Sequence, residues 1–245
     1  MSIITVCYNA QDVIESTINS VRIQDYENIE YIVVDGNSSD DTKIIIEQNR
    51  DAITKFISEP DNGLYYAMNK GLDMATGEYV WFINAGDRIA HSNTLSKIMS
   101  SSLILQDIYY GKTKIINKQG QVIGERRLTP PARLNRNSFK MGMLVCHQAI
   151  IIKKKLTTHY NTKYSITSDY DWVQSAIEKA SPEKIRNTHL TFCKFLEGGI
   201  SSKRMNKANM ERFHIMIEHF GLFQALFFNF IMSFRFIKSK IKGEL

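Results

Sequence analysis

Residues 29–42 read IEYIVVDGNSSDDT, an apolar run that ends abruptly in small and acidic residues. The first part, 29–35, has the length and the β-branched content of a buried strand. The second part supplies the turn-forming residues Gly, Asn and Ser, and Asp35 marks the boundary between the two. This pattern is typical of an α/β protein in which polar loops follow the carboxyl ends of central strands.

Similar units of strand and helix lie on both sides of this segment. Their alternation predicts a mostly parallel sheet with right-handed crossovers and helices on its faces. The predicted strands are 2–8, 29–35, 55–58, 78–84, 107–116, 121–127, 147–152 and 189–196. The predicted helices are 12–24, 42–48, 64–75, 169–179 and 206–220, with Asp12 as a cap of the first.

Three of the predicted strands are followed by an aspartate, namely Asp35, Asp61 and Asp87. Open parallel sheets bind ligands at the carboxyl ends of their strands, so these side chains are candidates for a binding site. Each has an alternative explanation, because Asp is common in turns and caps. The occurrence of all three at one sheet edge favours the binding site.

The composition limits the classes of protein. With 245 residues, 43% hydrophobic and 23% charged, the chain is neither disordered nor fibrous. Its three cysteines are far apart, which excludes a disulfide framework and a thiolate zinc site. Residues 1–125 hold 10 Lys and Arg against 17 Asp and Glu, a net charge of −7. Residues 126–245 hold 21 against 8, a net charge of +13, which suits anionic partners.

Four motifs occur in order: SIITVCYNA (2–10), IEYIVVDGNSSDDT (29–42), SEPDNGLYYAMNKGL (58–72) and ATGEYVWFINAGD (75–87). Together they resemble inverting family 2 glycosyltransferases, above all the bacterial enzymes that build capsule, O-antigen or exopolysaccharide. The resemblance covers about residues 2–90. It implies a GT-A fold, a nucleotide-sugar donor and Mn²⁺ or Mg²⁺, in a metal-dependent, hexosyl-type transferase.

The resemblance also implies a division of the chain. A single GT-A domain is expected over 1–220, with a nucleotide-sugar-binding part at 1–105 and an acceptor and catalytic-base part at 106–220. An apolar and basic C-terminal helix is expected at 221–245.

The family's donor and metal positions carry over to named residues. Asp87 matches the last Asp of the DxD metal motif, whose first Asp is replaced here by Asn84 or Ala85. Mg²⁺ often binds through one or two carboxylates together with substrate phosphates and water, so one remaining Asp is compatible with a metal. The residues that match donor-binding positions are Val6, Tyr8, Asp35, Asp61 and Asn69.

The family places its general base in the second half of the chain, where Ser168-Asp169-Tyr170-Asp171-Trp172 matches. Residues two apart on a helix point in different directions, so only one of the two aspartates serves, and Asp169 is preferred over Asp171. Capping is the alternative role for both. The acceptor or phosphate side is expected to include His147 of the CHQ motif, and Lys203 and Arg204 beyond Gly198-Gly199.

The segment 220–236, FGLFQALFFNFIMSFRF, is shorter than the roughly 20 apolar residues of a spanning helix. Lys238, Lys240 and Lys242 follow it, which suits a helix lying in a membrane interface. A helix packed on the protein's own core is the alternative, and both stay open. Met1 leads directly into the first strand, so no signal peptide is expected. The resemblance implies the bacterial cytoplasm, at the inner face of the membrane if the helix binds lipid.

We therefore expect a transferase that moves a sugar from a nucleotide-sugar donor to a saccharide acceptor, lipid-linked, with inversion. A sugar nucleotidyltransferase would carry a Gly-rich phosphate loop after its first strand, where Tyr8-Asn9-Ala10-Gln11 stands instead. The incomplete metal motif leaves a degenerate, partner-dependent or purely binding module as the alternative. No nucleic-acid-binding motif is present, and nucleic acid is not an expected partner.

Overall fold

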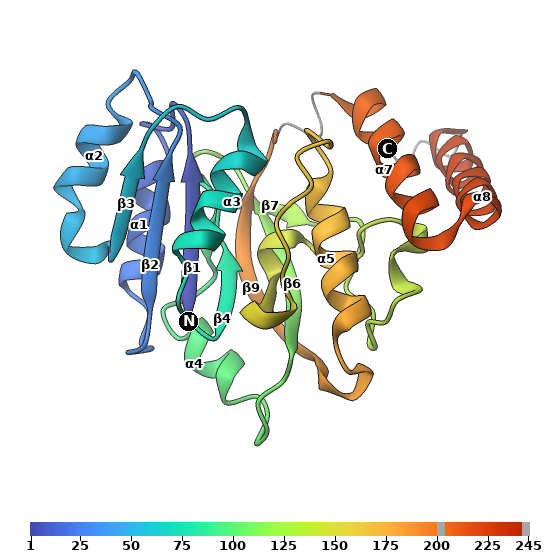
Figure 1. Ribbon diagram of the computed structural model, residues 1–245, viewed down its shortest axis with the longest axis horizontal. Helices are drawn as coiled ribbons and strands as arrows, with labels where there is room; N and C mark the ends of the chain where they lie inside the picture. Colours follow the sequence, from blue (N-terminus) through green and yellow to red (C-terminus); the bar gives the residue numbers. More distant parts are fainter. Residues whose placement is uncertain (200–203, 242–245) are drawn as a thin grey trace.

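The protein, in a computed structural model that describes residues 1–199 and 204–241, is built on one nine-stranded sheet (Figure 1). The strand order is β3-β2-β1-β4-β8-β6-β9-β5, and β7 also pairs with β6. The strands are β1 (Ser2–Cys7), β2 (Glu30–Asp35), β3 (Lys55–Ser58), β4 (Tyr79–Phe82), β5 (Arg88–Ile89), β6 (Ile108–Ile116), β7 (Val122–Glu125), β8 (Ile150–Lys153) and β9 (Ile185–Leu196).

Some helices cover the sheet, and two others lie beside it at one end of the molecule. In Figure 1, α3 and α5 lie in front of the sheet, and α7 and α8 lie at the end of the molecule far from β3. The helices are α1 (Ile14–Arg22), α2 (Thr42–Gln48), α3 (Leu64–Met74), α4 (Thr94–Met99), α5 (Ser168–Lys179), α7 (Met205–Phe220) and α8 (Leu222–Ile241).

The first half of the sheet forms because its strands are continuous apolar runs that can be buried on both faces. All six residues of β1 are buried, and β1 pairs in parallel with β2 on one side and β4 on the other. Strands buried on both faces need continuous apolar runs, and these are what β1, β2 and β4 have. The predicted α/β class is confirmed. The structure adds β5 and α4, which the sequence pattern did not indicate, and α1 begins at Ile14 without a cap from Asp12.

The second half of the sheet is mixed rather than parallel. Strand β8 runs antiparallel to β4 and β6, whereas β9 runs parallel to β6 and antiparallel to β5. Strands β6 and β9 therefore lie side by side in the sheet although they are distant in sequence. The carboxyl ends of β1, β2, β3, β4, β6 and β9 all lie at one edge.

Strand β9 contains a bulge opposite the middle of β6. Its register with β6 shifts on both sides of Lys112, and His189 has a left-handed φ of 60°. Gly111 lies against this bulge: a Cβ atom there would be 2.4 Å from the carbonyl oxygen of Leu190. Bulges of this kind re-aim side chains and are frequent beside active sites.

The two C-terminal helices pack on each other. Ala225, Phe228 and Met232 of α8 face the core, so part of the helix is bound to the protein itself. The opposite side of α8 exposes large apolar side chains, namely Leu222, Phe223, Leu226, Phe227, Phe230 and Phe234. Within the described residues, no helix has both the length and the apolar character needed to cross a bilayer.

Candidate active site

The loops that follow β1 and β2 are joined by hydrogen bonds at the edge of the sheet. The backbone N–H of Asn9 donates to Ser38 Oγ at 2.8 Å, and that of Ser39 donates to Asn9 Oδ1 at 2.9 Å. Asn9 has a left-handed φ of 47°, a conformation that asparagine tolerates better than most residues. The two loops therefore form one rigid rim.

Asp35 holds this rim from below. Its fully buried carboxylate accepts hydrogen bonds from the backbone and hydroxyl of Ser38, from Ser58 Oγ at 2.6 Å and from Cys7 Sγ at 3.6 Å. A buried carboxylate is stable only when its oxygens are satisfied in this way. Because these bonds occupy both oxygens, Asp35 supports the shape of the predicted donor site rather than offering a free oxygen to it.

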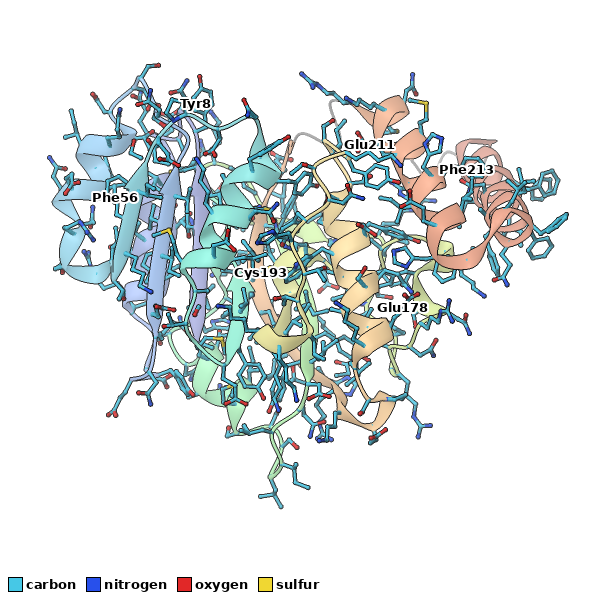
Figure 2. The ribbon with its side chains drawn as sticks, in the orientation of Figure 1. Tyr8, Phe56, Glu178, Cys193, Glu211 and Phe213 are labelled. Carbon is cyan, nitrogen blue, oxygen red and sulfur yellow. The ribbon has the colours of Figure 1, made fainter. Side chains whose placement is uncertain are left out.

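Tyr8, Gly36 and Asp61 come together on the rim. A Cβ atom on Gly36 would lie 3.4 Å from the Tyr8 ring and 3.6 Å from Asp61 Oδ2. Tyr8 is 66% exposed, and Figure 2 labels it at the upper edge of the sheet. The Asp61 side chain is only 6% exposed, with Lys70 Nζ at 2.7 Å from Oδ1, while Oδ2 has no hydrogen-bond partner. An unpaired buried carboxylate oxygen is costly, so this arrangement is suited to a ligand that donates a hydrogen bond.

Val6 and Asn69, the other predicted donor residues, are occupied within the protein. Val6 is buried in β1 as part of the core. The side-chain amide of Asn69 donates to the carbonyl of Tyr160 at 3.0 Å and accepts from the Tyr160 N–H at 2.7 Å. Asn69 thus ties α3 to the segment that leads into α5.

Asp87 lies just beyond β4 and is buried. Its Oδ1 accepts from the backbone N–H of Leu196 at 2.9 Å, and its Oδ2 accepts from Gln148 Nε2 at 2.9 Å. Burial raises the pKa of Asp87 well above its usual range, although these two hydrogen bonds oppose the shift. The carboxylate joins the ends of β4 and β9 and the turn before β8.

The residues at this position do not by themselves fit a resident metal ion. Both oxygens of Asp87 are used, and the buried Oδ1 of Asn84 is a nearby oxygen without a hydrogen-bond partner. Among the residues that the structure describes, no group of three His, Cys, Asp or Glu could hold a metal. A divalent cation needs several oxygen ligands, so most would have to come from outside the protein.

Asp169 lies in the first turn of α5. Its Oδ1 accepts from the Tyr65 hydroxyl at 3.3 Å and from the backbone N–H of Tyr170 at 3.0 Å. Burial raises the pKa of Asp169, while these hydrogen bonds and the charges of Arg126 and Arg212 limit the rise. A fixed carboxylate with a raised pKa has the properties of a general base.

Tyr65 connects the carboxylate of Asp169 to the loop that carries Asp61 on the rim. It lies in the first turn of α3, four residues after Asp61, and its hydroxyl also donates to the carbonyl of Ile166 at 2.8 Å. Its ring stacks on Tyr160 with the centroids 5.4 Å apart. The loop before α3 and the first turn of α3 therefore link the rim at Asp61 with the carboxylate of Asp169.

Glu211 of α7 fixes the segment that leads into Asp169. Its buried carboxylate accepts from the backbone N–H groups of Ser165, Ile166 and Thr167 at 2.9–3.1 Å, and from both hydroxyls of that segment. Burial alone would raise the pKa of Glu211, but these hydrogen bonds outweigh it and lower the pKa. Figure 2 shows Glu211 on the side of α7 that faces α5.

His147 is an internal packing residue. Its Nε2 lies 2.6 Å from the hydroxyl of Tyr160, and its ring packs on Phe82 and Trp172. Burial lowers the pKa of His147 to about 3, so it is neutral at physiological pH. Its predicted contact with the acceptor or a phosphate would require this aromatic cluster to open.

The remaining predicted residues lie away from Asp169 or outside the described part. Asp171 Oδ1 pairs with His219 Nε2 at 2.7 Å, which ties α5 to the end of α7. Arg204 is exposed directly before α7. Lys203 lies outside the described residues.

Sequence reasoning missed Ser38, Ser58, Tyr65, Gln148 and Glu211. Tyr65 falls inside a motif that the resemblance rests on, so its place in the sequence could have indicated it. Glu211 sits on a helix that shows only amphipathic spacing, and its partners are 44 to 46 residues away. No local signal marks such a residue.

A polar rim at the carboxyl ends of the strands and a half-buried carboxylate, Asp169, from the second half of the chain are the features of a candidate active site on a mixed α/β sheet. Residues 2–159 match the profile of Glycosyl transferase family 2. The chain belongs to this family.

Two relatives illustrate the match. An uncharacterised glycosyltransferase of Mycobacterium tuberculosis is 29% identical over 213 residues, covering 83% of this chain and 78% of the relative. The GalNAc(5)-diNAcBac-PP-undecaprenol beta-1,3-glucosyltransferase of Campylobacter jejuni is 29% identical over 189 residues, covering 74% and 60%.

Solved structures show the same fold. Residues 1–349 of TarS from S. aureus, also solved with UDP-GlcNAc, superpose with a TM-score of 0.69 at 19% identity. The match covers 88% of this chain, which spans 65% of the TarS chain. Glucosyl-3-phosphoglycerate synthase of M. tuberculosis, in complex with Mn²⁺ and UDP, superposes with a TM-score of 0.61 at 16% identity, covering 90% and 80%. The predicted GT-A fold is confirmed.

Proposed function

We propose that the protein transfers a hexosyl group from a nucleotide sugar to a saccharide acceptor, lipid-linked, with inversion at the anomeric carbon, in bacterial surface polysaccharide synthesis. The observation that carries the proposal is the link through the first turn of α3. Asp61, whose Oδ2 lacks a hydrogen-bond partner, lies in the loop directly before α3, and four residues later the Tyr65 hydroxyl is bonded to Asp169. A donor held on the rim would thus lie beside the segment that positions the base.

The geometry supports the following roles. Tyr8 offers an exposed aromatic face beside the Asp61 oxygen, which suits a nucleobase with an N–H group. Asp169 accepts the proton of the acceptor hydroxyl while that oxygen bonds to C1 of the sugar. The bond from C1 to the diphosphate breaks at the same time, and the nucleoside diphosphate leaves with the bonding electrons. One displacement from the opposite face inverts the anomeric carbon.

Mn²⁺ or Mg²⁺ belongs to this proposal as a cation that arrives with the donor. A diphosphate and water can supply the oxygen ligands that the described residues lack. At the end of β4 the Asn84 amide oxygen has no hydrogen-bond partner, and Asp87 would have to exchange one of its two hydrogen bonds to contact the cation. When bound, the cation would neutralise charge on the leaving diphosphate.

Donor binding tests the proposal. Calorimetry with UDP, GDP and dTDP sugars, with Mn²⁺ or with EDTA, is expected to show tight binding of one nucleotide class. Asp61→Asn is expected to weaken that binding about tenfold, because a charge-assisted hydrogen bond contributes about 1.5–3 kcal/mol. Asp73→Asn is the matched control, since this carboxylate of α3 is exposed and pairs with His159 at the surface. Absence of binding by every donor would favour the degenerate module instead.

We also propose that the exposed side of α8 contacts an anionic membrane surface, which would place the enzyme at the inner face of the cytoplasmic membrane beside its acceptor. Six large apolar side chains on one side of a helix suit insertion into a bilayer interface. Lys238, Lys240 and Lys242 follow in the sequence and would attract anionic headgroups.

Sedimentation with phosphatidylglycerol vesicles tests this contact. The triple variant Phe223→Ser, Phe227→Ser, Phe230→Ser is expected to bind at least tenfold more weakly, because burial of one such side chain contributes about 1.5–3 kcal/mol. The control triple Leu103→Ser, Ile104→Ser, Leu105→Ser changes equally exposed apolar residues in the loop before β6. Equal loss in both triples, or no loss in the first, would argue against α8 as the contact.

A further inference from the structure

A cavity of about 380 Å³ opens between β6, β7, the start of β9 and the segment after β7. Its polar side is formed by Lys112, Arg126 and His189, and its apolar side by Leu128, Pro130 and Ala132. None of these residues belongs to the rim, and none is hydrogen-bonded to the carboxylates of Asp87, Asp169 or Glu211. The cavity therefore needs its own explanation.

The cations of this cavity have no close carboxylate partner among the described residues, although Lys112 acts at longer range on Glu125 and Arg126 on Asp169. Within the described part of the chain, neither Lys112 nor Arg126 forms an ion pair, and Arg126 Nη2 donates only to the carbonyl of Met143 at 3.2 Å. The one carboxylate of the lining, Glu125, is paired with Lys114. The cavity thus carries an excess of positive charge beside an apolar wall.

The backbone is shaped to bring His189 to this place. His189 lies in the bulge of β9 and has a left-handed φ, a conformation in which histidine is found more often than most non-glycine residues. The N–H of His189 is held by Asn187 Oδ1 at 2.8 Å, and Asn187 in turn donates to the carbonyl of Pro131 across the cavity. The bulge and these two hydrogen bonds fix the backbone of His189 at the cavity.

The cavity is a neighbour of the candidate base. Arg126 lines it and is also close enough to Asp169 for its charge to act on that carboxylate. Cys146, also in the lining, directly precedes His147, whose imidazole lies 2.6 Å from Tyr160 in the stack below Tyr65. The cavity and the candidate base therefore share Arg126 as a neighbour.

We infer that this cavity, formed by Lys112, Arg126 and His189 against Leu128 and Pro130, binds the phosphate of the acceptor at its junction with an apolar chain. Guanidinium, ammonium and imidazole groups together suit phosphate oxygens, and arginine can bind them in a bidentate manner. The apolar wall suits the first carbons of a lipid. The inference rests on the proposed transfer to a lipid-linked acceptor, and names the part of the acceptor that is recognised.

Calorimetry in the presence of an excess of the nucleoside diphosphate of the donor that binds, UDP, GDP or dTDP, tests the inference, because that nucleotide would occupy the proposed donor site. The probes are farnesyl diphosphate, inorganic pyrophosphate and glucuronate. We expect farnesyl diphosphate to bind most tightly. Arg126→Gln and Lys112→Gln should each raise its Kd about tenfold or more, as expected for a lost charge-assisted bond. Lys155→Gln removes an exposed charge elsewhere and should leave the Kd unchanged.

Each of the following results would overturn one part of the inference. Equal binding of pyrophosphate and farnesyl diphosphate would mean a site for free phosphate rather than for a lipid junction. Binding of glucuronate alone would mean a carboxylate site. Unchanged affinity in both variants would remove the cavity from the binding of phosphate altogether. Failure of the proposed function is seen separately, as a wild-type protein that does not bind UDP or any nucleotide sugar.

Discussion

Asp169→Asn is expected to lower kcat by about 10²–10⁴-fold, the usual contribution of a general base, while the Kd of the donor stays the same. The amide keeps the shape of the carboxylate and can still accept from the Tyr65 hydroxyl, so the fold around α5 is preserved. What is lost is the ability to take the proton from the acceptor hydroxyl. Steady-state rates and donor calorimetry on the same samples separate the two quantities.

The pH profile gives a second, independent readout for Asp169. The base works only when ionised, and burial raises its pKa, so kcat should fall as the pH decreases through a value above the usual aspartate range. Asp171→Asn is the matched control two residues away, because its carboxylate pairs with His219 on the far side. Full activity of Asp169→Asn together with loss in Asp171→Asn would exchange their roles.

Glu211→Ala is expected to lower the free energy of unfolding by several kcal/mol and to reduce kcat as well. It leaves the N–H groups of Ser165, Ile166 and Thr167 without an acceptor, at about 1–3 kcal/mol for each one that stays buried. The freed segment is the one that precedes Asp169, so the base loses its fixed position. Urea unfolding measures the first effect, and kcat at fixed donor saturation measures the second.

The pH dependence of stability distinguishes the charge of Glu211 from its shape. Hydrogen bonds lower its pKa in the folded state, so its stabilisation is present above the ordinary glutamate pKa and is lost as the pH falls through the lowered one. The difference between the wild type and Glu211→Gln should therefore shrink in acid. Glu218→Gln, on the same helix and paired with Lys163 at the surface, should change stability by less than about 1 kcal/mol. A Glu211→Ala protein with wild-type stability and kcat would contradict the assigned role.

The fold of the first half could be predicted because its information is local. Strands such as β1 and β2 are continuous apolar runs, and the turn residues after them are equally distinct. The half of the sheet that contains β5 and β9 could be predicted less completely. Short strands such as β5 and the bulge in β9 depend on partners far away in sequence. Sequence periodicity does not contain the register of such pairs.

The candidate site divides in the same way. Asp61, Asp87 and Asp169 could be selected because they stand in motifs or directly after strands, and their proposed roles stay predictions. What the sequence could not indicate is which oxygens are free: both oxygens of Asp87 are bonded, whereas Asp61 Oδ2 is not. That difference is set by Gln148, Leu196 and other groups that approach only in the folded chain.

The long strand β9 has a consequence for how the chain must be made. The part that matches the family profile ends at residue 159, yet β6 pairs with β9, which begins at Ile185. A chain cut at the profile boundary would present β6 as an open edge, with unpaired amides and apolar side chains such as Tyr109 and Ile116 newly wetted. Such a fragment would tend to aggregate rather than bind a donor. During synthesis, β6 therefore gains its β9 partner only after residues up to about Leu196 have left the ribosome.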